Sequence, residues 1–200
     1  MSAQAPQQII KNAASTLQRD LLKARGFTKS GSNWLCRQEW TRVINLQLSS
    51  YNSAEEARFT INLGILIPAL RAACGEPPIE GNPKEYDCDL RQRIGRLLAQ
   101  AEDKWWSVTP ETDPDHLAAE LADTLLHHGL PWFERFPDLV AVARCTDAGF
   151  PGSRSAVAYQ LAGDEDSATK LMADAIAESP PMGLPKLRRI AKANGIPLPG

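Results

Sequence analysis

Three consecutive stretches of the chain alternate apolar and polar side chains with a period of two. Residues 33–40, 43–51 and 59–67 follow this pattern, which is typical of strands that bury one face. Short polar turns at 30–32 and 52–53 precede or separate them, so we expect antiparallel neighbours. A sheet with one covered face therefore constrains the fold more than any other feature.

Helical periodicity flanks these strands on both sides. Residues 7–25 place Ile10, Ala13, Ala14, Leu17, Leu21 and Ala24 on one face, which predicts a helix. Pro6 suits its first turn and Gly26 its end. Asp113 and Pro114 mark another helix start, and we expect Gly129 to end that helix. Further helices are predicted over 137–146, 154–162, 165–178 and 185–194.

These elements predict an α+β fold, an antiparallel sheet packed by helices with a C-terminal all-helical hairpin extension. Phe150, Pro151 and Gly152 mark a boundary. We therefore expect an α+β domain over 1–150, with an extension over 151–200 docked on it. The extension resembles a single tetratricopeptide-like hairpin, since small residues and a proline recur at that spacing: Gly163-Asp164, Ala168, Ala175 and Pro180.

Charge is close to balanced, with 22 Lys and Arg against 24 Asp and Glu, a net charge of −2. Hydrophobic residues make up 43% of the chain, which excludes disorder throughout. A near-neutral total makes nucleic acid an unlikely partner. Residues 1–108 nevertheless carry a net +3 and residues 109–200 a net −5, so cationic side chains gather in the first half.

From the sequence we expect neither a signal peptide nor a membrane-spanning segment. Residues 1–8 lack the basic and apolar regions of a signal peptide, and no apolar stretch is long enough to span a bilayer. Four cysteines without a C-x-x-C pair indicate reduced, packed thiols. We therefore expect a cytoplasmic location and no membrane partner.

Two adjacent predicted strands share a polar face that lacks charge. Asn45, Gln47 and Ser49 stand on one strand, and Thr60 and Asn62 on the next. Uncharged amides offer both donors and acceptors, so this face is a candidate for a ligand-binding groove. The alternative is that these short side chains merely lie under a helix or loop.

Arginine and tryptophan concentrate in one later segment, at Arg91, Arg93, Arg96, Trp105 and Trp106. Arginine forks bind carboxylates or phosphates and stack on aromatic rings, which fits an anionic ligand or a partner surface. The alternative is internal pairing with the nearby acids Asp87, Asp89 and Asp103, with the tryptophans in the core.

Motifs for catalysis or metal binding are missing. His116, Glu120, Asp123 and His127 share a helix face, but the two histidines are about 16 Å apart, and i,i+4 pairs on a solvated face explain the pattern. No nucleophile motif or phosphate loop is present. We predict no metal, no cofactor and no catalytic residue.

Several segments resemble the bacterial domain-of-unknown-function family numbered 4304, over roughly residues 8–145. The matching segments are Leu22-x-x-x-Gly26-Phe27 with Trp34, the strand 59–64, Cys88 with 93–97, Asp103-x-Trp105-Trp106, and Leu130-Pro131. The resemblance implies an α+β domain. It implies no activity and no catalytic residues.

Three functions stay open at this point. The first is a non-catalytic module that binds a protein partner, of the immunity or antitoxin kind, through the polar face or the Arg/Trp segment. The second is binding of a small anionic ligand or nucleotide by Arg91, Arg93 and Arg96 against Trp105. The third is an enzyme with an unrecognised site, for which Asp89 and Asp103 are the acid–base candidates.

Overall fold

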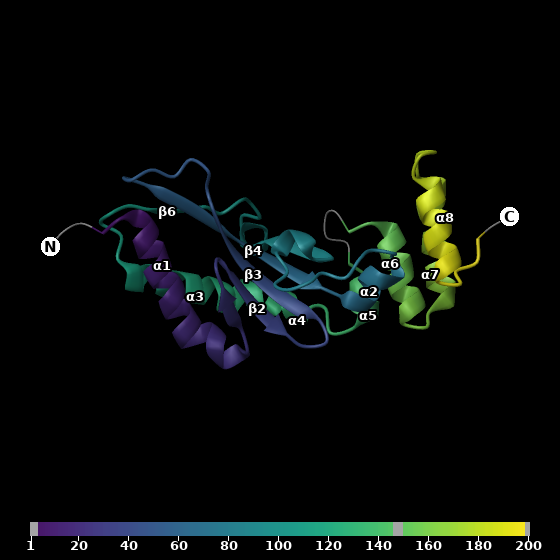
Figure 1. The fold of residues 1–200 in the computed structure, drawn as a ribbon, viewed down its shortest axis with the longest axis horizontal. Coiled ribbons are helices and arrows are strands. Elements are labelled where there is room, and N and C mark those ends of the chain that lie inside the picture. Colours follow the sequence, from purple (N-terminus) through teal and green to yellow (C-terminus); the bar gives the residue numbers. More distant parts are fainter. Residues whose placement is uncertain (1–3, 146–149, 199–200) are drawn as a thin grey trace. The chain divides into compact units, whose positions relative to one another are not determined.

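The computed structural model describes residues 4–145 and 150–198 of the chain (Figure 1). It divides into two compact units, each built from two segments. Unit 1 comprises Met1–Leu66 and Glu80–Glu134, and unit 2 comprises Ile67–Ile79 and Arg135–Gly200. The sheet and the candidate site residues lie in unit 1, and the helical hairpin lies in unit 2.

Unit 1 is built on a six-stranded antiparallel sheet, which confirms the predicted α+β class. Its strands are β1 (Thr28–Ser30), β2 (Asn33–Arg37), β3 (Thr41–Leu48), β4 (Ala57–Leu66), β5 (Leu90–Arg93) and β6 (Trp106–Val108). The order is β1-β2-β3-β4-β5, and β6 also pairs with β4. The three predicted strands correspond to β2, β3 and β4.

The first helix begins and ends where the sequence predicts, but its buried face shifts along the way. Pro6 opens α1 (Pro6–Leu17), and Gly26 ends the helical run with a φ of 79°. Between them the chain passes through a π-helical turn, Gln18–Leu22, and a 3₁₀ turn, Lys23–Arg25. The wider turn rotates the later residues, so Leu22 is buried and the prediction that Ala24 faces the core is wrong.

The second predicted helix also starts as expected. The Asp113 side chain accepts a hydrogen bond from the Asp115 amide at the start of α3 (Pro114–Thr124). Gly129 does not end the helical run, contrary to prediction, because a π-helical turn (Leu125–Gly129) leads directly into α4 (Leu130–Glu134). A Cβ at Gly129 would lie 2.7 Å from Leu125 Cδ2 and 3.2 Å from Ile94 Cδ1. A side chain at position 129 would therefore displace the ends of the Leu125 and Ile94 side chains.

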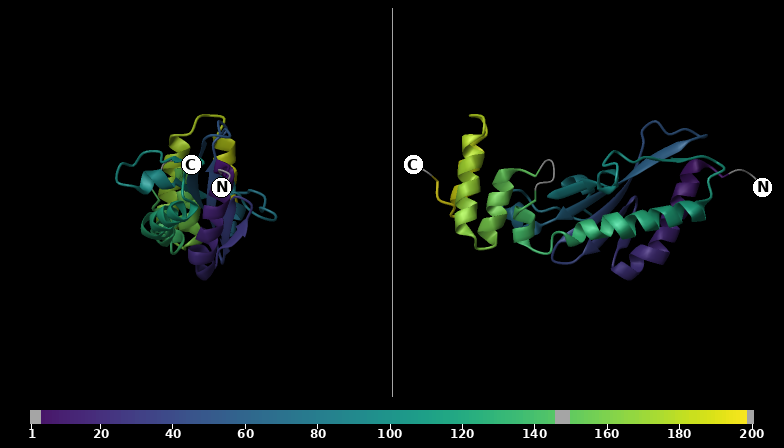
Figure 2. Two further views of the ribbon diagram at one scale, coloured as in Figure 1. Left: turned by 90° about the vertical axis from the view of Figure 1, so that its left-hand side faces the viewer. Right: turned by 180° about the vertical axis from the view of Figure 1, so that it is seen from behind.

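The apolar face of the sheet lies against α1 and α3. Ile44, Ile61 and Leu63 on this face are each no more than 1% exposed. Seen from behind, α3 runs across the sheet beside α1 (Figure 2). Burial of this face follows from the alternation in the sequence, and it leaves the opposite face of β2, β3 and β4 free of long helices.

Composition predicts a loop over residues 75–90, where proline and glycine are frequent, and period alone does not assign the stretch from Cys88 to Leu97 as helix or strand. In unit 1 this segment forms a 3₁₀ turn, Glu85–Asp87, then β5 and a second 3₁₀ turn, Ile94–Leu97. The backbone amide of Asp89 donates to Ile65 O at 2.9 Å, next to the pairing of β5 with β4. The segment therefore returns to the sheet after a long excursion and brings its arginines to β4.

Unit 2 is helical in its described residues. Its helices are α2 (Pro68–Ala73), α5 (Leu139–Ala143), α6 (Gly152–Leu161), α7 (Glu165–Ala177) and α8 (Leu184–Ala193). The last three match the predicted C-terminal helices, and α6 and α7 form the expected hairpin. No helix within residues 4–145 and 150–198 is long and apolar enough to cross a membrane.

Candidate functional site

Four polar side chains form one row across the face of the sheet opposite α1 and α3. The strand register places Asn33 of β2 opposite Asn45 of β3, Asn45 opposite Asn62 of β4, and Asn62 opposite Arg93 of β5. Side chains at paired positions point to the same face of an antiparallel sheet. The row therefore brings together three of the predicted site residues, Asn45, Asn62 and Arg93.

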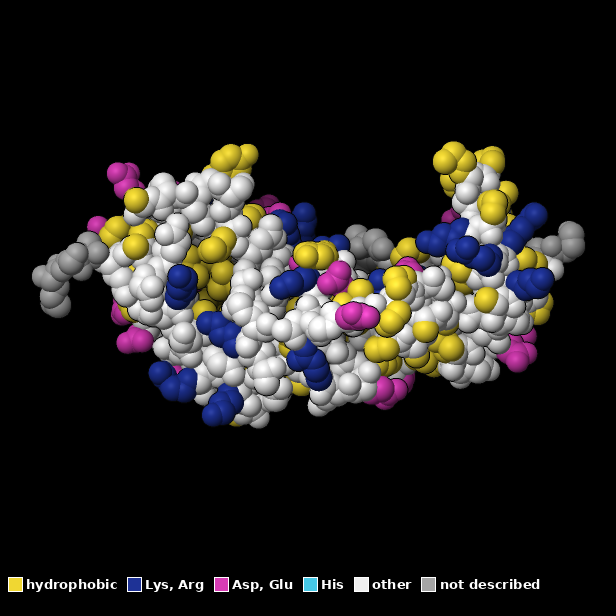
Figure 3. Space-filling model, viewed as in Figure 1, with side chains coloured by type: hydrophobic (Ala, Val, Ile, Leu, Met, Phe, Trp, Pro, Cys, Tyr) yellow, Lys and Arg dark blue, Asp and Glu magenta, His cyan; other side chains and the backbone are white. Residues whose placement is uncertain are grey.

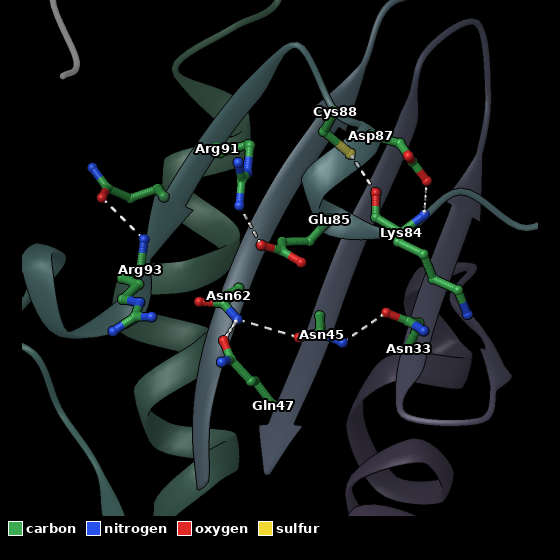
Figure 4. A network of polar contacts seen from close by, with 11 residues as sticks. Asn33, Asn45, Gln47, Asn62, Lys84, Glu85, Asp87, Cys88, Arg91 and Arg93 are labelled. Atoms are coloured by element: carbon green, nitrogen blue, oxygen red, sulfur yellow. Dashed lines mark hydrogen bonds and ion pairs between the residues drawn. The ribbon is translucent and has the colours of Figure 1, made fainter. Parts of the chain in front are cut away.

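The amides of this row form a directional hydrogen-bond network (Figure 4). Asn62 Nδ2 donates to Asn45 Oδ1 at 3.2 Å and to Gln47 Oε1 at 2.8 Å. Asn45 Nδ2 in turn donates to Asn33 Oδ1 at 2.9 Å. Asn33 and Asn62 are 3% and 4% exposed, respectively. The network therefore fixes two nearly buried amides and the half-buried Asn45.

The amide network leaves some of its own polar atoms without a hydrogen-bond partner among the described residues. Asn62 Oδ1 and Gln47 Nε2 have no hydrogen-bond partner among the described residues. Neither of these two atoms is fully buried. The Gln47 side chain is exposed, and Asn62 Oδ1 is oriented away from Asn45 (Figure 4). Asn33 Nδ2 also has no partner among the described residues, so the network leaves one amide acceptor and two amide donors unpaired, of which the Gln47 donor is on an exposed side chain.

Close backbone packing closes the face at one end. A Cβ on Gly64 would lie 2.6 Å from Cys88 Sγ and 3.4 Å from Glu85 O. The loop before β5 therefore lies directly on the sheet at Gly64. At the other end, Thr60 Oγ1 donates to Lys104 O at 2.8 Å, and Thr60 is 1% exposed. The amide row lies between these two covered ends.

The three predicted arginines of this segment all bind acceptors within unit 1. Arg91 Nη2 donates to Glu85 Oε1 at 2.6 Å, on the same sheet face (Figure 4). Arg93 Nη1 donates to Asp103 Oδ2 at 2.6 Å, and Arg96 Nη1 to Ala101 O at 2.8 Å. Arg96 Nε lies 3.8 Å from Asp103 Oδ1. The guanidinium charges are therefore largely neutralised by this chain's own carboxylates.

The two adjacent tryptophans have different surroundings. Trp106 is 4% exposed, stacks on Phe59 at 5.4 Å between ring centroids, and donates from Nε1 to Glu120 of α3 at 2.7 Å. It lies in the core with the apolar face. Trp105 is half-buried, and the Arg93 guanidinium lies 5.8 Å from its ring centroid. Only Trp105 joins the arginine cluster.

Gly95 allows the 3₁₀ turn Ile94–Leu97, here called the arginine turn, to pack against the segment that carries Trp105. A Cβ at Gly95 would lie 2.2 Å from Glu102 O and 2.3 Å from Lys104 N. Any other residue would force these two backbone segments apart. Gly95 therefore positions Arg93 and Arg96 beside Asp103.

Two contributors to the site were not predicted. Asn33 completes the amide row, and Glu85 pairs with Arg91, whereas the sequence suggested only aspartates as partners. The alternation of 33–40 with Trp34 and Cys36 buried places Asn33 on the opposite face, so that signal was available. Glu85 carried no such signal, because the loop path that brings it over β4 depends on tertiary packing.

The histidine stripe remains on the surface. His116, Glu120, Asp123 and His127 are exposed, and His127 Nδ1 lies 3.0 Å from Asp123 Oδ1. The described residues contain no group of three or more His, Cys, Asp or Glu that could hold a metal ion. This helix face is accounted for by i,i+4 pairing and by the hydrogen bond to Trp106.

Comparison with known proteins gives a family and no nearer relative. No curated protein and no solved structure matches the chain. A family model described as a domain of unknown function, DUF4304, matches residues 18–135. The matched segment covers more than half of the chain and contains the amide row, the Gly64–Cys88 contact and the arginine turn. The chain therefore belongs to the DUF4304 family.

Proposed function

We propose that unit 1 is a non-catalytic binding module that holds a polar segment of a protein partner against the amide row. The observation that supports this proposal is the set of amide groups that the hydrogen-bond network leaves unpaired. Among the described residues, the amide groups of the network without a hydrogen-bond partner are Asn33 Nδ2, Asn62 Oδ1 and Gln47 Nε2, and the last two belong to side chains that are hydrogen-bonded to each other. A fixed acceptor beside a fixed donor matches the groups of a peptide backbone.

Charge pairing favours a protein partner over a small anion. A phosphate or carboxylate ligand would have to displace Asp103 from Arg93 and Glu85 from Arg91. Both displaced carboxylates would then lie beside an incoming negative charge. A neutral peptide segment does not compete with these ion pairs, so it binds the face as it stands.

Trp105 provides an apolar contact beside the row. Its ring is half-buried under the Arg93 guanidinium. Tryptophan and arginine are enriched among residues that dominate protein–protein binding energy. The proposed interface therefore consists of a polar centre, Asn62 with Gln47, and an aromatic edge, Trp105 with Arg93.

The chemistry of the row favours binding over catalysis. Carboxamides neither gain nor lose protons near neutral pH, so they position and recognise groups without acid–base chemistry. The acid–base candidate Asp103 is held by Arg93 and Arg96. An immunity or antitoxin role is the specific form of binding that we propose, with a toxin as the partner. A toxin gene adjacent to the gene of this chain would support that form.

Site-specific photo-crosslinking tests the proposal with a matched pair of glutamines. A photoreactive amino acid replaces Gln47 in one variant and Gln7 in the other; the first variant loses the Gln47 amide and keeps Asn62, Trp105 and Arg93 for binding. Gln7 is exposed on α1, which packs on the opposite face of the sheet. In cells of the source organism, we expect one discrete protein adduct at position 47 and none at position 7.

Two further variants identify the surface. Trp105→Ala should weaken the adduct formed at position 47, since it removes the aromatic edge without touching the amides. Equal adducts at positions 47 and 7 would contradict the proposal. So would a saturable change of tryptophan fluorescence with phosphate or ATP that Arg93→Ala abolishes, because this result would assign the segment to an anionic ligand.

A further inference from the structure

Helix α8 concentrates positive charge that unit 2 does not neutralise. Lys186, Arg188, Arg189 and Lys192 lie within seven residues, and no acidic residue occurs between 181 and 198. All four side chains are exposed, and none has a hydrogen bond or ion pair within the described ranges. The space-filling view shows basic side chains gathered over α8 (Figure 3).

Other arginines of unit 2 are used differently. Arg71 and Arg154 both bind the Glu76 carboxylate, with Arg71 Nη1 at 3.1 Å. They are 16% and 17% exposed as side chains, so this cluster ties α2 to α6. The cations of α8 make no such contact, and stabilisation of unit 2 does not account for them.

Packing fixes the direction in which α8 presents its charge. Ile190 and Ala191 are 6% and 0% exposed, which orients the apolar side of the helix into unit 2. Asn194 Nδ2, at the C-terminal end, donates to Ala73 O of α2 at 2.8 Å. The helix is thereby anchored at its end and along one side, and the remaining surface is basic.

The angular spread of the cations indicates the shape of their partner. At 3.6 residues per turn, Lys186 and Arg188 point about 160° apart around the exposed side, along about 9 Å of helix between residues 186 and 192. Arg189 and Lys192 lie between them. A flat lipid surface would contact only part of this arc, and the apolar side that would insert into a bilayer is already buried. A groove with phosphates on both walls can reach all of it.

We propose that α8 binds double-stranded DNA by lying in the major groove and contacting phosphates on both strands. The major groove is about 12 Å wide and admits one α-helix. Contacts from lysine and arginine to phosphate are independent of sequence, so the binding is nonspecific and strongly dependent on salt. The near-neutral total charge of the chain does not reveal this site, because the positive charge is local to α8.

This proposal does not rest on the function proposed for unit 1. It concerns other residues, another unit and another class of partner. DNA binding by α8 would bring whatever unit 1 recognises to a DNA surface, yet either activity can fail alone.

Fluorescence anisotropy with a labelled 20-base-pair duplex of arbitrary sequence tests the proposal on the full chain. With four phosphate contacts, affinity should fall by about 150-fold between 50 and 200 mM salt. Arg189→Gln with Lys192→Gln removes two contacts, so the fall should shrink to about 12-fold and binding at 50 mM should weaken. Both residues are exposed, and an unchanged thermal unfolding curve confirms that the variant folds.

Removing two charges elsewhere provides the matched control. Lys11→Gln with Lys23→Gln takes two exposed lysines from unit 1 and should leave both the affinity and its salt dependence unchanged. Absence of duplex binding at 50 mM salt overturns the proposal. It is also overturned by equal losses in the two double variants, by equal affinity for a single strand, or by binding to phosphatidylserine vesicles in place of the duplex.

Discussion

Gly64 and Cys88 are in such close contact that a Cβ at position 64 would lie 2.6 Å from the Cys88 sulfur and 2.9 Å from its Cβ. The contact joins the C-terminal part of β4 to the loop before β5. It keeps that loop on the sheet, where Glu85 meets Arg91 and Cys88 Sγ donates to Lys84 O at 3.5 Å. Both residues belong to the segments that resemble the DUF4304 family. Their contact is a structural reason for a glycine at position 64.

Gly64→Ala should lower the free energy of unfolding by about 1–3 kcal/mol, because an added methyl group overpacks the contact with Cys88. Urea denaturation measures the change. Gly152→Ala is the control, since nothing lies within 4 Å of a Cβ there, and it should be nearly neutral. In a double-mutant cycle, Cys88→Ala should reduce the cost of Gly64→Ala. Strictly additive effects would show that the two sites are not coupled.

Stability should fall in alkaline solution because of the Cys88 thiol. Burial, with a smaller contribution from Asp89, raises the pKa of this thiol above its ordinary value of 9.0. The unfolded chain therefore releases this proton at lower pH than the folded chain. The contribution of the Cys88 thiol to the free energy of unfolding is complete below pH 9 and decreases above it. The decrease between pH 8 and pH 10 is about 1.4 kcal/mol.

Comparison with Cys88→Ala isolates that effect from lysine and tyrosine titration. The unfolding free energy of the unchanged chain should drop more steeply between the two pH values than that of the variant. Iodoacetamide at pH 8 provides a second readout, because it should label the half-buried Cys145 and spare Cys88. Parallel pH profiles, or rapid labelling of Cys88, would contradict the assignment.

Asn62 and Gln47 should differ in their importance for folding although they share a hydrogen bond. Asn62→Ala removes the donor that serves both Asn45 and Gln47, at a nearly buried position, and should cost about 1–3 kcal/mol. Gln47→Ala removes an exposed side chain and should cost less than about 0.5 kcal/mol. Paired thermal or urea unfolding measures both. The prediction fails if Gln47→Ala is the more damaging change.

The Arg93–Asp103 ion pair should contribute little to stability. Its side chains are 36% and 42% exposed, so water screens the interaction despite the 2.6 Å distance. A double-mutant cycle of Arg93→Ala and Asp103→Ala should give a coupling free energy of about 0.2–1 kcal/mol. The coupling should shrink in 1 M salt. A coupling that exceeds about 2 kcal/mol and resists salt would indicate a desolvated pair.

Local periodicity determined much of the fold. Two-residue alternation identified β2, β3 and β4, and the caps at Pro6 and Asp113 located two helix starts. These signals are local, since each depends on a few neighbouring residues. The exposure of Ala24 and the continuation of the helical run past Gly129 do not follow from such local signals. A π-helical turn shifts the buried face before Ala24, and Gly129 packs against Ile94, which is distant in sequence.

The sequence predicted only part of the candidate site. Alternation placed Asn45, Gln47 and Asn62 on a shared face, because side-chain direction in a strand follows from residue spacing alone. It did not give the register that aligns Asn33, Asn45, Asn62 and Arg93 in one row. Register depends on which strands pair, so the tertiary structure decided it.

The sequence by itself determined the α+β class, the amphipathic strands and helices, and the presence of an arginine-rich segment with tryptophans. Only the tertiary structure decided how the arginines are used: Glu85 and Asp103 neutralise Arg91 and Arg93, Trp106 enters the core, and the cations of α8 stay exposed. The physical reason is that secondary structure follows from local spacing. Charge neutralisation and burial depend on contacts between segments that are far apart along the chain.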